Sequence, residues 1–264
     1  MVEQNTGKIN KLEKALPEGL LVDAAWMTAH GFSTNLRSHY VKTGRLEQPT
    51  RSVYRRPRGT LSWQQTVISL QTILLRNPLF VGGRTALELQ GFAHYLKDGA
   101  REIHLYGPKR PPTWLDKLPL AVRFFYHNDA KLFRNTPIHI GVTNREVHFV
   151  EQPWGHLDWH LTLSSPERAI LELLDEIPDR ETFEQADKLF EGLSSLRPRH
   201  LQKLLTDSKN VKVKRLFFFF AARHAHAWTK FMDRNEFDLG SGKRMLVKGG
   251  HLDKVFQITV PDGF

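Results

Sequence analysis

The stretch of residues 19–59 constrains the fold of this chain more than any other part of the sequence. Residues 20–30 carry an apolar stripe that predicts a short helix. Gly31 follows at a position where glycine commonly ends a helix in the left-handed conformation. Ser33 is a favoured N-cap, so a second helix is expected to begin directly after it. Two helices joined by a short glycine-containing turn are therefore expected here.

The second helix has one apolar side and one polar side. Leu36 and Tyr40 are four residues apart, so they share a helix face and are expected to pack inward. Gly44 ends this helix. Residues 46–56 then predict two short strands around a turn at residues 48–50. A helix, a turn, a helix and a basic hairpin together are typical of a winged helix-turn-helix, whose second helix enters the DNA major groove.

The charge of this stretch supports the same interpretation. Between Arg37 and Arg58 there are seven Lys or Arg residues and one acid, Glu47. A solvated basic face is the alternative interpretation. If the stretch binds DNA, Asn35, Arg37 and Ser38 are expected to reach base edges and the other cations to hold phosphates. The residues expected to contact DNA are Ser33, Thr34, Asn35, Arg37, Ser38, Lys42, Arg45, Arg51, Tyr54, Arg55, Arg56 and Arg58.

The length of the chain suits one large or two ordinary domains, and its charge is distributed unevenly between the N-terminal quarter and the rest. The chain has 264 residues, a net charge of +10 and a sequence pI near 9.8, which favours a polyanionic partner. Residues 1–60 hold ten Lys or Arg against five Asp or Glu, so charge density is highest there. We expect a DNA-binding domain at 1–60 and a second domain at 61–264, in which residues 61–95 form a helical connector.

Several classes of protein are excluded or disfavoured by composition. The chain has no cysteine, which excludes disulfides and thiol chemistry. No segment approaches the ~20 apolar residues that a membrane helix requires. The N-terminus is polar and lacks the apolar run of a signal peptide. A cytoplasmic protein without a membrane partner is expected.

The C-terminal part mixes strands and helices, so the predicted class is α+β. Short β-rich runs are followed by three amphipathic helices between residues 167 and 205. Residues 211–231 are the most apolar stretch of the chain, and residues 216–222 within it are apolar on all sides, which predicts a central buried helix. The predicted strands are residues 101–106, 120–127, 138–142, 146–151 and 158–163.

The chemistry-bearing patterns outside the basic stretch are weak. His156, Asp158 and His160 alternate as a strand face would, but no second cluster accompanies them, so no metal site is expected. A Gly82–Gly83 pair before a helix is a tight turn or an anion site. No pattern identifies a catalytic residue, and no cofactor is expected.

Four further cations occur where structure alone does not demand charge. Lys214 and Arg215 precede the apolar helix, where they oppose the helix dipole or alternate on an edge strand. Lys243 and Arg244 lie in a glycine-rich turn. These four residues are the candidates for a binding role in the C-terminal domain.

Four segments of the chain, residues 31–47, 81–96, 212–228 and 238–261, carry a resemblance to a known family. Together they resemble the AbiEi-type antitoxins of bacterial abortive-infection (type IV) toxin–antitoxin systems. The resemblance implies a bifunctional protein that represses its own operon by binding inverted repeats and counters a nucleotidyltransferase-like toxin through its C-terminal domain. Lys214, Arg215, Lys243 and Arg244 are then the expected antitoxicity residues, and a monomer or weak dimer is expected to bind DNA cooperatively.

Two other functions remain open at this stage. In the first, the C-terminal domain would be a nuclease or nucleotidyl-modifying enzyme that the N-terminal domain guides to DNA. In the second, the protein would be a transcriptional regulator whose C-terminal domain senses a small molecule. Because no enzyme signature is present, a non-enzymatic antitoxin and repressor is the favoured hypothesis.

Overall fold

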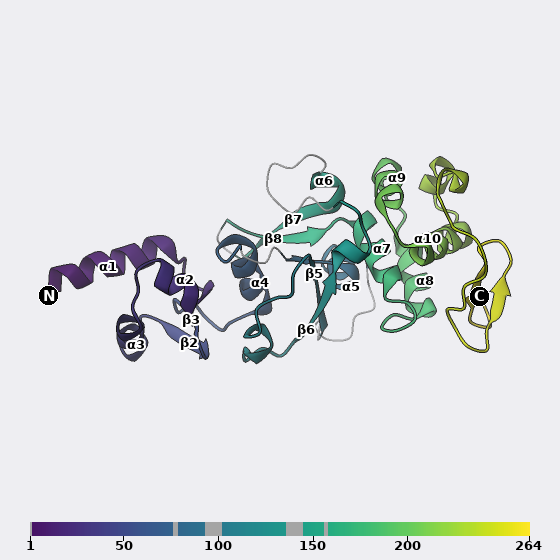
Figure 1. The fold of residues 1–264 in the computed structure, drawn as a ribbon. Coiled ribbons are helices and arrows are strands. Elements are labelled where there is room, and N and C mark those ends of the chain that lie inside the picture. Colours follow the sequence, from purple (N-terminus) through teal and green to yellow (C-terminus); the bar gives the residue numbers. More distant parts are fainter. Residues whose placement is uncertain (1, 76–78, 93–101, 136–144, 156–157) are drawn as a thin grey trace.

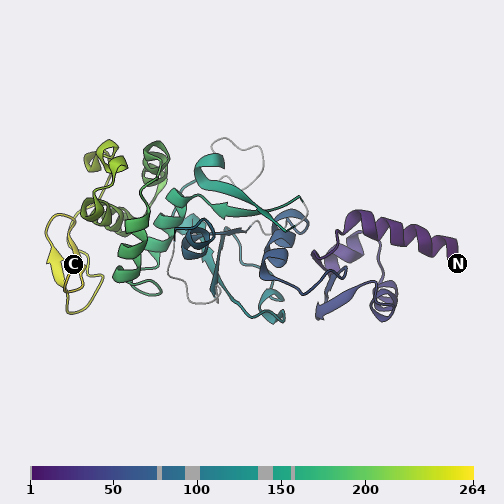
Figure 2. The same cartoon turned by 180° about the vertical axis from the view of Figure 1, so that it is seen from behind.

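The chain forms an elongated molecule with its termini at opposite ends (Figure 1, Figure 2). The computed structural model describes residues 2–75, 79–92, 102–135, 145–155 and 158–264. A small N-terminal module, a central mixed sheet and a C-terminal helical region follow one another along the long axis. The α+β class expected from the sequence is confirmed.

The N-terminal module combines three helices with a small antiparallel sheet of order β1-β3-β2. The elements are α1 (Val2–Ala15), β1 (Leu21–Asp23), α2 (Ala24–Ala29), α3 (Thr34–Lys42), β2 (Glu47–Thr50) and β3 (Val53–Arg55).

The expectation of a single helix over residues 20–30 is wrong, because this segment begins as strand β1. Leu21 pairs with Arg55 of β3, and the side chain of Leu21 is fully buried. Asp23 then caps α2, since its Oδ1 accepts a hydrogen bond from the Trp26 N–H at 2.7 Å. Strand pairing therefore shortens the helix to Ala24–Ala29.

The turn between α2 and α3 is the one that the sequence predicted. Gly31 has a φ of 87°, which is the left-handed region that favours glycine. Ser33 Oγ accepts from the Leu36 N–H at 3.4 Å and caps α3. Tyr40 is fully buried on the inner face of α3. The hairpin turn, expected at residues 48–50, instead lies at 51–52, between β2 and β3.

Helix α4 (Trp63–Thr72) joins the module to the central sheet. It begins with a capping box of Ser62 and Gln65, as favourable helix starts do. Its Ser69 Oγ accepts a hydrogen bond from the Leu21 N–H at 2.8 Å, so the first strand of the module is bonded directly to this helix. The same helix packs on β8 of the central sheet.

The central sheet has five strands in the order β6-β5-β4-β8-β7. The pairs β5–β6 and β4–β8 are parallel, and β4–β5 and β7–β8 are antiparallel. The segment expected to be a connector supplies the middle strand β4 and the helix after it. The elements are β4 (Phe80–Val81), α5 (Gly83–Leu89), β5 (Glu102–Gly107), β6 (Arg123–Asn128), α6 (Arg145–His148), β7 (Phe149–Trp154) and β8 (Trp159–Ser164).

One of the expected strands differs from the structure, and a second cannot be compared with it. Residues 138–142 lie outside the described residues. Residues 146–148 form the end of the short helix α6, and the strand begins at Phe149. The other three predicted strands coincide with β5, β6 and β8.

The C-terminal region packs helices around the predicted apolar helix, α10. Phe217 and Phe220 on α10 are fully buried, which confirms the central helix. A short antiparallel pair of strands follows at the C-terminal end. The elements are α7 (Pro166–Asp175), α8 (Phe183–Gly192), α9 (Pro198–Asp207), α10 (Val211–His224), β9 (His251–Asp253) and β10 (Ile258–Val260), with 3₁₀ turns at Leu115–Lys117, Asp129–Lys131, Ala227–Phe231 and Arg234–Glu236.

No helix in the described parts of the chain combines the length and the apolar character needed to cross a bilayer.

Candidate nucleic-acid interface

The outer face of α3 is polar and open to solvent. Its exposed side chains recur three or four residues apart, as neighbours on one helix face do. They offer amide, hydroxyl, imidazole and ammonium groups, which can donate to or accept from base edges in the major groove. Helix α3 contains no acidic residue. The exposed residues on this helix are Thr34, Asn35, Ser38, His39 and Lys42, and Ser33 before it is exposed as well.

Arg37 was expected to reach base edges, but the structure places its side chain on the inner side of α3. Its side chain is buried among α2, α3 and β3, with 6% of the residue exposed. Its Nη1 donates to Ala24 O at 2.7 Å and to Thr28 Oγ1 at 3.2 Å, and its Nη2 donates to Thr34 Oγ1 at 2.8 Å. The guanidinium therefore ties α3 to α2.

Tyr54, a second expected contact, is also buried and belongs to the module core. The guanidinium of Arg37 lies 5.7 Å from the centre of its ring. His39 is the reverse case, because sequence reasoning omitted it and the structure exposes it. Its spacing of four residues from Asn35 was the signal that it shares the polar face.

Arg55 and Arg56 were expected to hold phosphates, and the structure corrects both expectations. Arg55 is 5% exposed, and its Nε lies 2.5 Å from Glu47 Oε2 across the hairpin. Arg56 Nη1 donates to Leu16 O at 3.1 Å, and its Nη2 pairs with Glu18 at 3.0 Å. Arg55 ties the two strands of the hairpin together, and Arg56 ties the hairpin base to the segment after α1, so both charges are already compensated.

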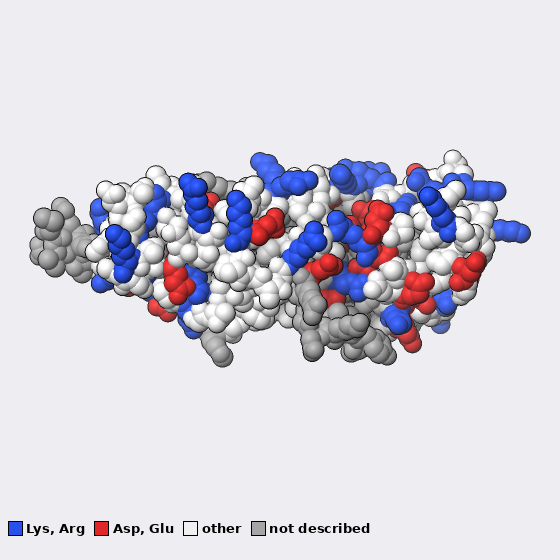
Figure 3. Space-filling model, turned by 90° about the horizontal axis from the view of Figure 1, so that it is seen from below, with Lys and Arg blue, Asp and Glu red and all other residues white. Residues whose placement is uncertain are grey.

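Of the cations expected to contact DNA, those that remain exposed lie at the end of α3 and along the hairpin. Arg51 is at the tip of the β2–β3 turn, and Arg58 follows β3. Figure 3 shows that Lys and Arg side chains predominate over Asp and Glu at the N-terminal end of the face it displays. The candidate interface therefore consists of the polar face of α3 and the exposed cations Lys42, Arg45, Arg51 and Arg58.

The four C-terminal candidates separate into two buried and two exposed residues. Arg215 is 2% exposed and donates to the backbone carbonyls of Leu239 at 2.7 Å and of Gly242 at 2.7 Å. Lys214 is 5% exposed, and burial lowers the pKa of its ammonium group. Both lie within α10 and not before it, and the bonds to backbone carbonyls explain the buried charge of Arg215, contrary to expectation. Lys243 and Arg244 are exposed in the following loop.

The Gly82–Gly83 turn, considered as an anion site, is occupied by a carboxylate of the chain itself. Glu172 Oε2 accepts from the Gly83 N–H at 2.9 Å and from Ser164 Oγ at 2.8 Å. A side chain at Gly82 would overlap Glu172 and Tyr106, so glycine is required for this close approach. The turn is thus a packing feature of the sheet domain.

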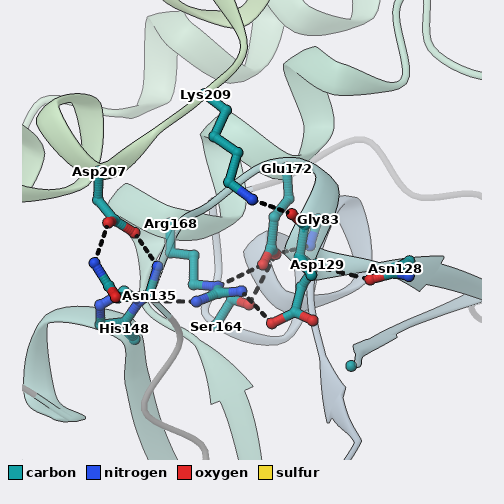
Figure 4. Close-up of polar contacts among 12 residues, drawn as sticks. Gly83, Asn128, Asp129, Asn135, His148, Ser164, Arg168, Glu172, Asp207 and Lys209 are labelled. Carbon is teal, nitrogen blue, oxygen red and sulfur yellow. Dashed lines mark hydrogen bonds and ion pairs between the residues drawn. The ribbon is translucent and has the colours of Figure 1, made fainter. Parts of the chain in front are cut away.

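The same carboxylate belongs to a buried charge cluster around Arg168 (Figure 4). Arg168 Nε lies 2.7 Å from Glu172 Oε1, and its Nη1 lies 2.8 Å from His148 Nδ1. Asp129 Oδ2 lies 3.3 Å from Nη2. Burial, together with the adjacent Arg168 guanidinium, lowers the pKa of His148 to about 3. The neutral imidazole accepts from Arg168 and helps to satisfy a fully buried cation.

The described residues contain no group of three His, Cys, Asp or Glu side chains arranged to hold a metal ion. Of the alternating trio considered above, His156 lies outside the described residues, and Asp158 and His160 are exposed. A second imidazole pair occurs on β5 and β6, where His104 Nδ1 lies 3.0 Å from His127 Nε2. Burial lowers the pKa of His104 to about 4.

Comparisons with known proteins cover nearly the whole chain. A family model described as a transcriptional regulator, AbiEi antitoxin, type IV toxin–antitoxin system, matches residues 100–261. A model described as the AbiEi antitoxin N-terminal domain of a transcriptional regulator matches residues 5–98. No curated protein matches the chain.

One similar solved structure is the crystal structure of the RV2827C protein from Mycobacterium tuberculosis. It aligns with a TM-score of 0.57 over 96% of this chain and 89% of that chain, at 14% sequence identity. At this identity the likeness concerns the fold alone.

Proposed function

This chain belongs to the AbiEi antitoxin family of type IV toxin–antitoxin transcriptional regulators, and from that premise we propose that its N-terminal module binds the operator of its own operon. Elements α1, β1, α2, α3, β2 and β3 follow the order of a winged helix-turn-helix, with α3 in the place of the recognition helix. The bound operator contains inverted repeats, occupied cooperatively by a monomer or weak dimer.

The exposed polar face of α3 is the observation that carries this proposal. Structure explains the buried side of the helix through Tyr40 and Arg37, but packing does not require Asn35, Ser38 or His39 on the outer side. An amide such as that of Asn35 pairs well with adenine, and a hydroxyl such as that of Ser38 pairs with several bases. These side chains are assigned to base edges.

The exposed cations supply the sequence-independent part of the affinity. Lys42, Arg45, Arg51 and Arg58 would each neutralise one phosphate. Since each such contact contributes about −0.9 to the slope of log K against log[salt], four contacts predict a slope of about −3.6. Arg55 and Arg56 are excluded from this count because each is already paired with a carboxylate.

Fluorescence anisotropy of the full chain on labelled duplexes tests this assignment. One duplex carries the upstream region of its own gene, and a second carries a scrambled sequence. Asn35→Ala should cost about 1–3 kcal/mol on the first duplex and little on the second. Arg45→Ala should weaken binding to both equally and flatten the salt slope by about 0.9. Absence of binding to the upstream region at low salt refutes the DNA-binding proposal.

The C-terminal domain is proposed to counter a nucleotidyltransferase-like toxin. Lys243 and Arg244 are the two exposed cations among the antitoxicity candidates, and they support this role because nothing in the packing requires their charge. Co-expression with the toxin tests the proposal. The double variant Lys243→Ala/Arg244→Ala should lose protection while its thermal unfolding is unchanged. Full protection by a normally folded double variant would remove these residues from the mechanism.

A further inference from the structure

Helix α1 carries three exposed lysines that belong neither to the core of the N-terminal module nor to the candidate interface described above. Lys8, Lys11 and Lys14 are exposed, whereas Leu12 and Leu16 on the same part of the chain are buried. Among the described residues, none of these lysines forms an ion pair. Lysines on a solvated helix need no partner. Their position relative to α3 therefore decides whether they could contact DNA that is bound by α3.

One flank of α1 faces the turn of the helix-turn-helix. Lys11 Nζ lies 3.7 Å from the point that a Cβ on Gly31 would occupy, so this ammonium group sits beside the α2–α3 turn. At 100° per residue, Lys8 lies about 60° around the helix from Lys11 and one turn nearer the N-terminus. Both lysines therefore belong to the flank on the side of the turn.

The opposite flank of α1 has the opposite charge and another neighbour. Glu13 Oε1 lies 3.9 Å from Arg56 Nη2, at the hairpin base. The acidic side chain is thus placed against the structural cations of the module, and the lysines are placed against the turn. Among the described side chains of α1, this separation of signs places lysines, and not Glu13, on the side near the start of α3.

From this placement we infer that Lys8 and Lys11 form a second phosphate-binding arm, which contacts the DNA backbone beside the N-terminal end of α3. The inference rests on the proposed DNA binding by α3. When a recognition helix places its N-terminal residues on base edges, the turn before it lies next to the phosphates that border the groove. Helix α3 has nine residues and spans about 13 Å, comparable with the ~12 Å width of the major groove.

The arm complements the cations already assigned at the other end of α3. Lys42 and Arg45 lie at and just beyond the C-terminus of α3, and Lys11 lies by the turn before its N-terminus. Cations at both ends of the helix would border both phosphate backbones of one groove. With Lys8 and Lys11 included, the number of phosphates contacted rises from about four to about six, and the expected slope steepens from about −3.6 to about −5.4.

The salt dependence of binding by the full chain separates this arm from a solvated face. The test variant is Lys8→Gln/Lys11→Gln, and the charge-matched control is Lys188→Gln/Lys230→Gln, two exposed lysines of the C-terminal region. Anisotropy is measured between 50 and 200 mM NaCl on the upstream duplex and on the scrambled duplex.

The test variant should flatten the slope by about 1.8, so its deficit relative to wild type shrinks roughly tenfold across this salt range. The loss should be equal on both duplexes, and Lys8→Arg/Lys11→Arg should restore wild-type behaviour. The control should match wild type in slope and affinity.

Two results overturn the inference while leaving DNA binding by α3 intact. One is an unchanged slope in the test variant. The other is a loss confined to the upstream duplex, which would mean that the lysines act by positioning α3. If wild type itself fails to bind either duplex, the proposed function fails, and the inference fails with it.

Discussion

Replacing Arg37 by alanine distinguishes a structural guanidinium from a base-reading one. The wild-type side chain makes three hydrogen bonds: those to Ala24 and Thr28 join α3 to α2, and the one to Thr34 lies within the first turn of α3. Two of these acceptors keep a partner in the variant, because Thr28 Oγ1 also donates to Ala24 O at 2.8 Å. The loss is therefore that of the bonds and packing, without newly orphaned groups. We expect the variant to destabilise the module by about 2–3 kcal/mol.

Hydrogen exchange on the full chain measures this loss where it occurs. Peptides that cover residues 24–42 should lose protection by roughly 30- to 150-fold, since each 1.4 kcal/mol corresponds to a factor of ten. Arg45→Ala is the matched control. Its side chain is exposed, so its effect on protection should stay within about 0.5 kcal/mol.

Binding by the same variants supplies the second half of the test. Under conditions where the module is folded, Arg37→Ala should affect the upstream and scrambled duplexes equally. Unchanged exchange protection, together with a loss of affinity on the upstream duplex only, would refute the structural role. It would return Arg37 to the base-reading residues that the sequence alone suggested.

Three further predictions concern the C-terminal domain. His148 has a pKa of about 3 in the folded chain and an ordinary value near 6.5 when unfolded, so below pH 6.5 the unfolded state binds the extra proton and stability falls as pH falls. In urea titrations at pH 6.5 and pH 5, wild type should therefore lose about 1.6 kcal/mol more than His148→Asn, and equal losses would contradict this. Gly82→Ala should lower the melting temperature through overlap with Glu172, by an amount equivalent to about 1–3 kcal/mol, and calorimetry with no shift would contradict the close approach. Arg215→Ala should increase hydrogen exchange in residues 239–260, where its carbonyl acceptors lie, whereas Lys243→Ala should leave exchange unchanged; the reverse pattern would contradict their assigned burial.

Local sequence signals were sufficient to predict an element wherever its backbone conformation depends on residues that are near in the sequence. Gly31 and Ser33 predicted the turn and the cap of α3, because a left-handed glycine and an N-cap serine act within a few residues. The apolar run of α10 predicted a buried helix for the same kind of reason, since a helix without a polar face must be covered.

Local signals failed where a distant strand competed for the backbone. Leu21 and its neighbours have an apolar pattern compatible with a helix, but pairing with β3 makes them a strand. The pairing partner lies more than 30 residues away, so no window around Leu21 contains it. The hairpin turn lies at residues 51–52 and not at 48–50 for a related reason. The register of β3 depends on its pairing with both β1 and β2, which a local sequence window does not contain.

The sequence by itself determined that the first 60 residues are basic and carry a helix-turn-helix pattern, because composition and short-range spacing are both present in it. Only the tertiary structure decided which of those cations are free to meet a polyanion. Arg37, Arg55 and Arg56 have the same charge as Arg45, but their guanidinium groups are held by carbonyls, hydroxyls and carboxylates from other elements. Such partners are brought together by packing, so a count of charges along the chain cannot separate a structural arginine from a binding one.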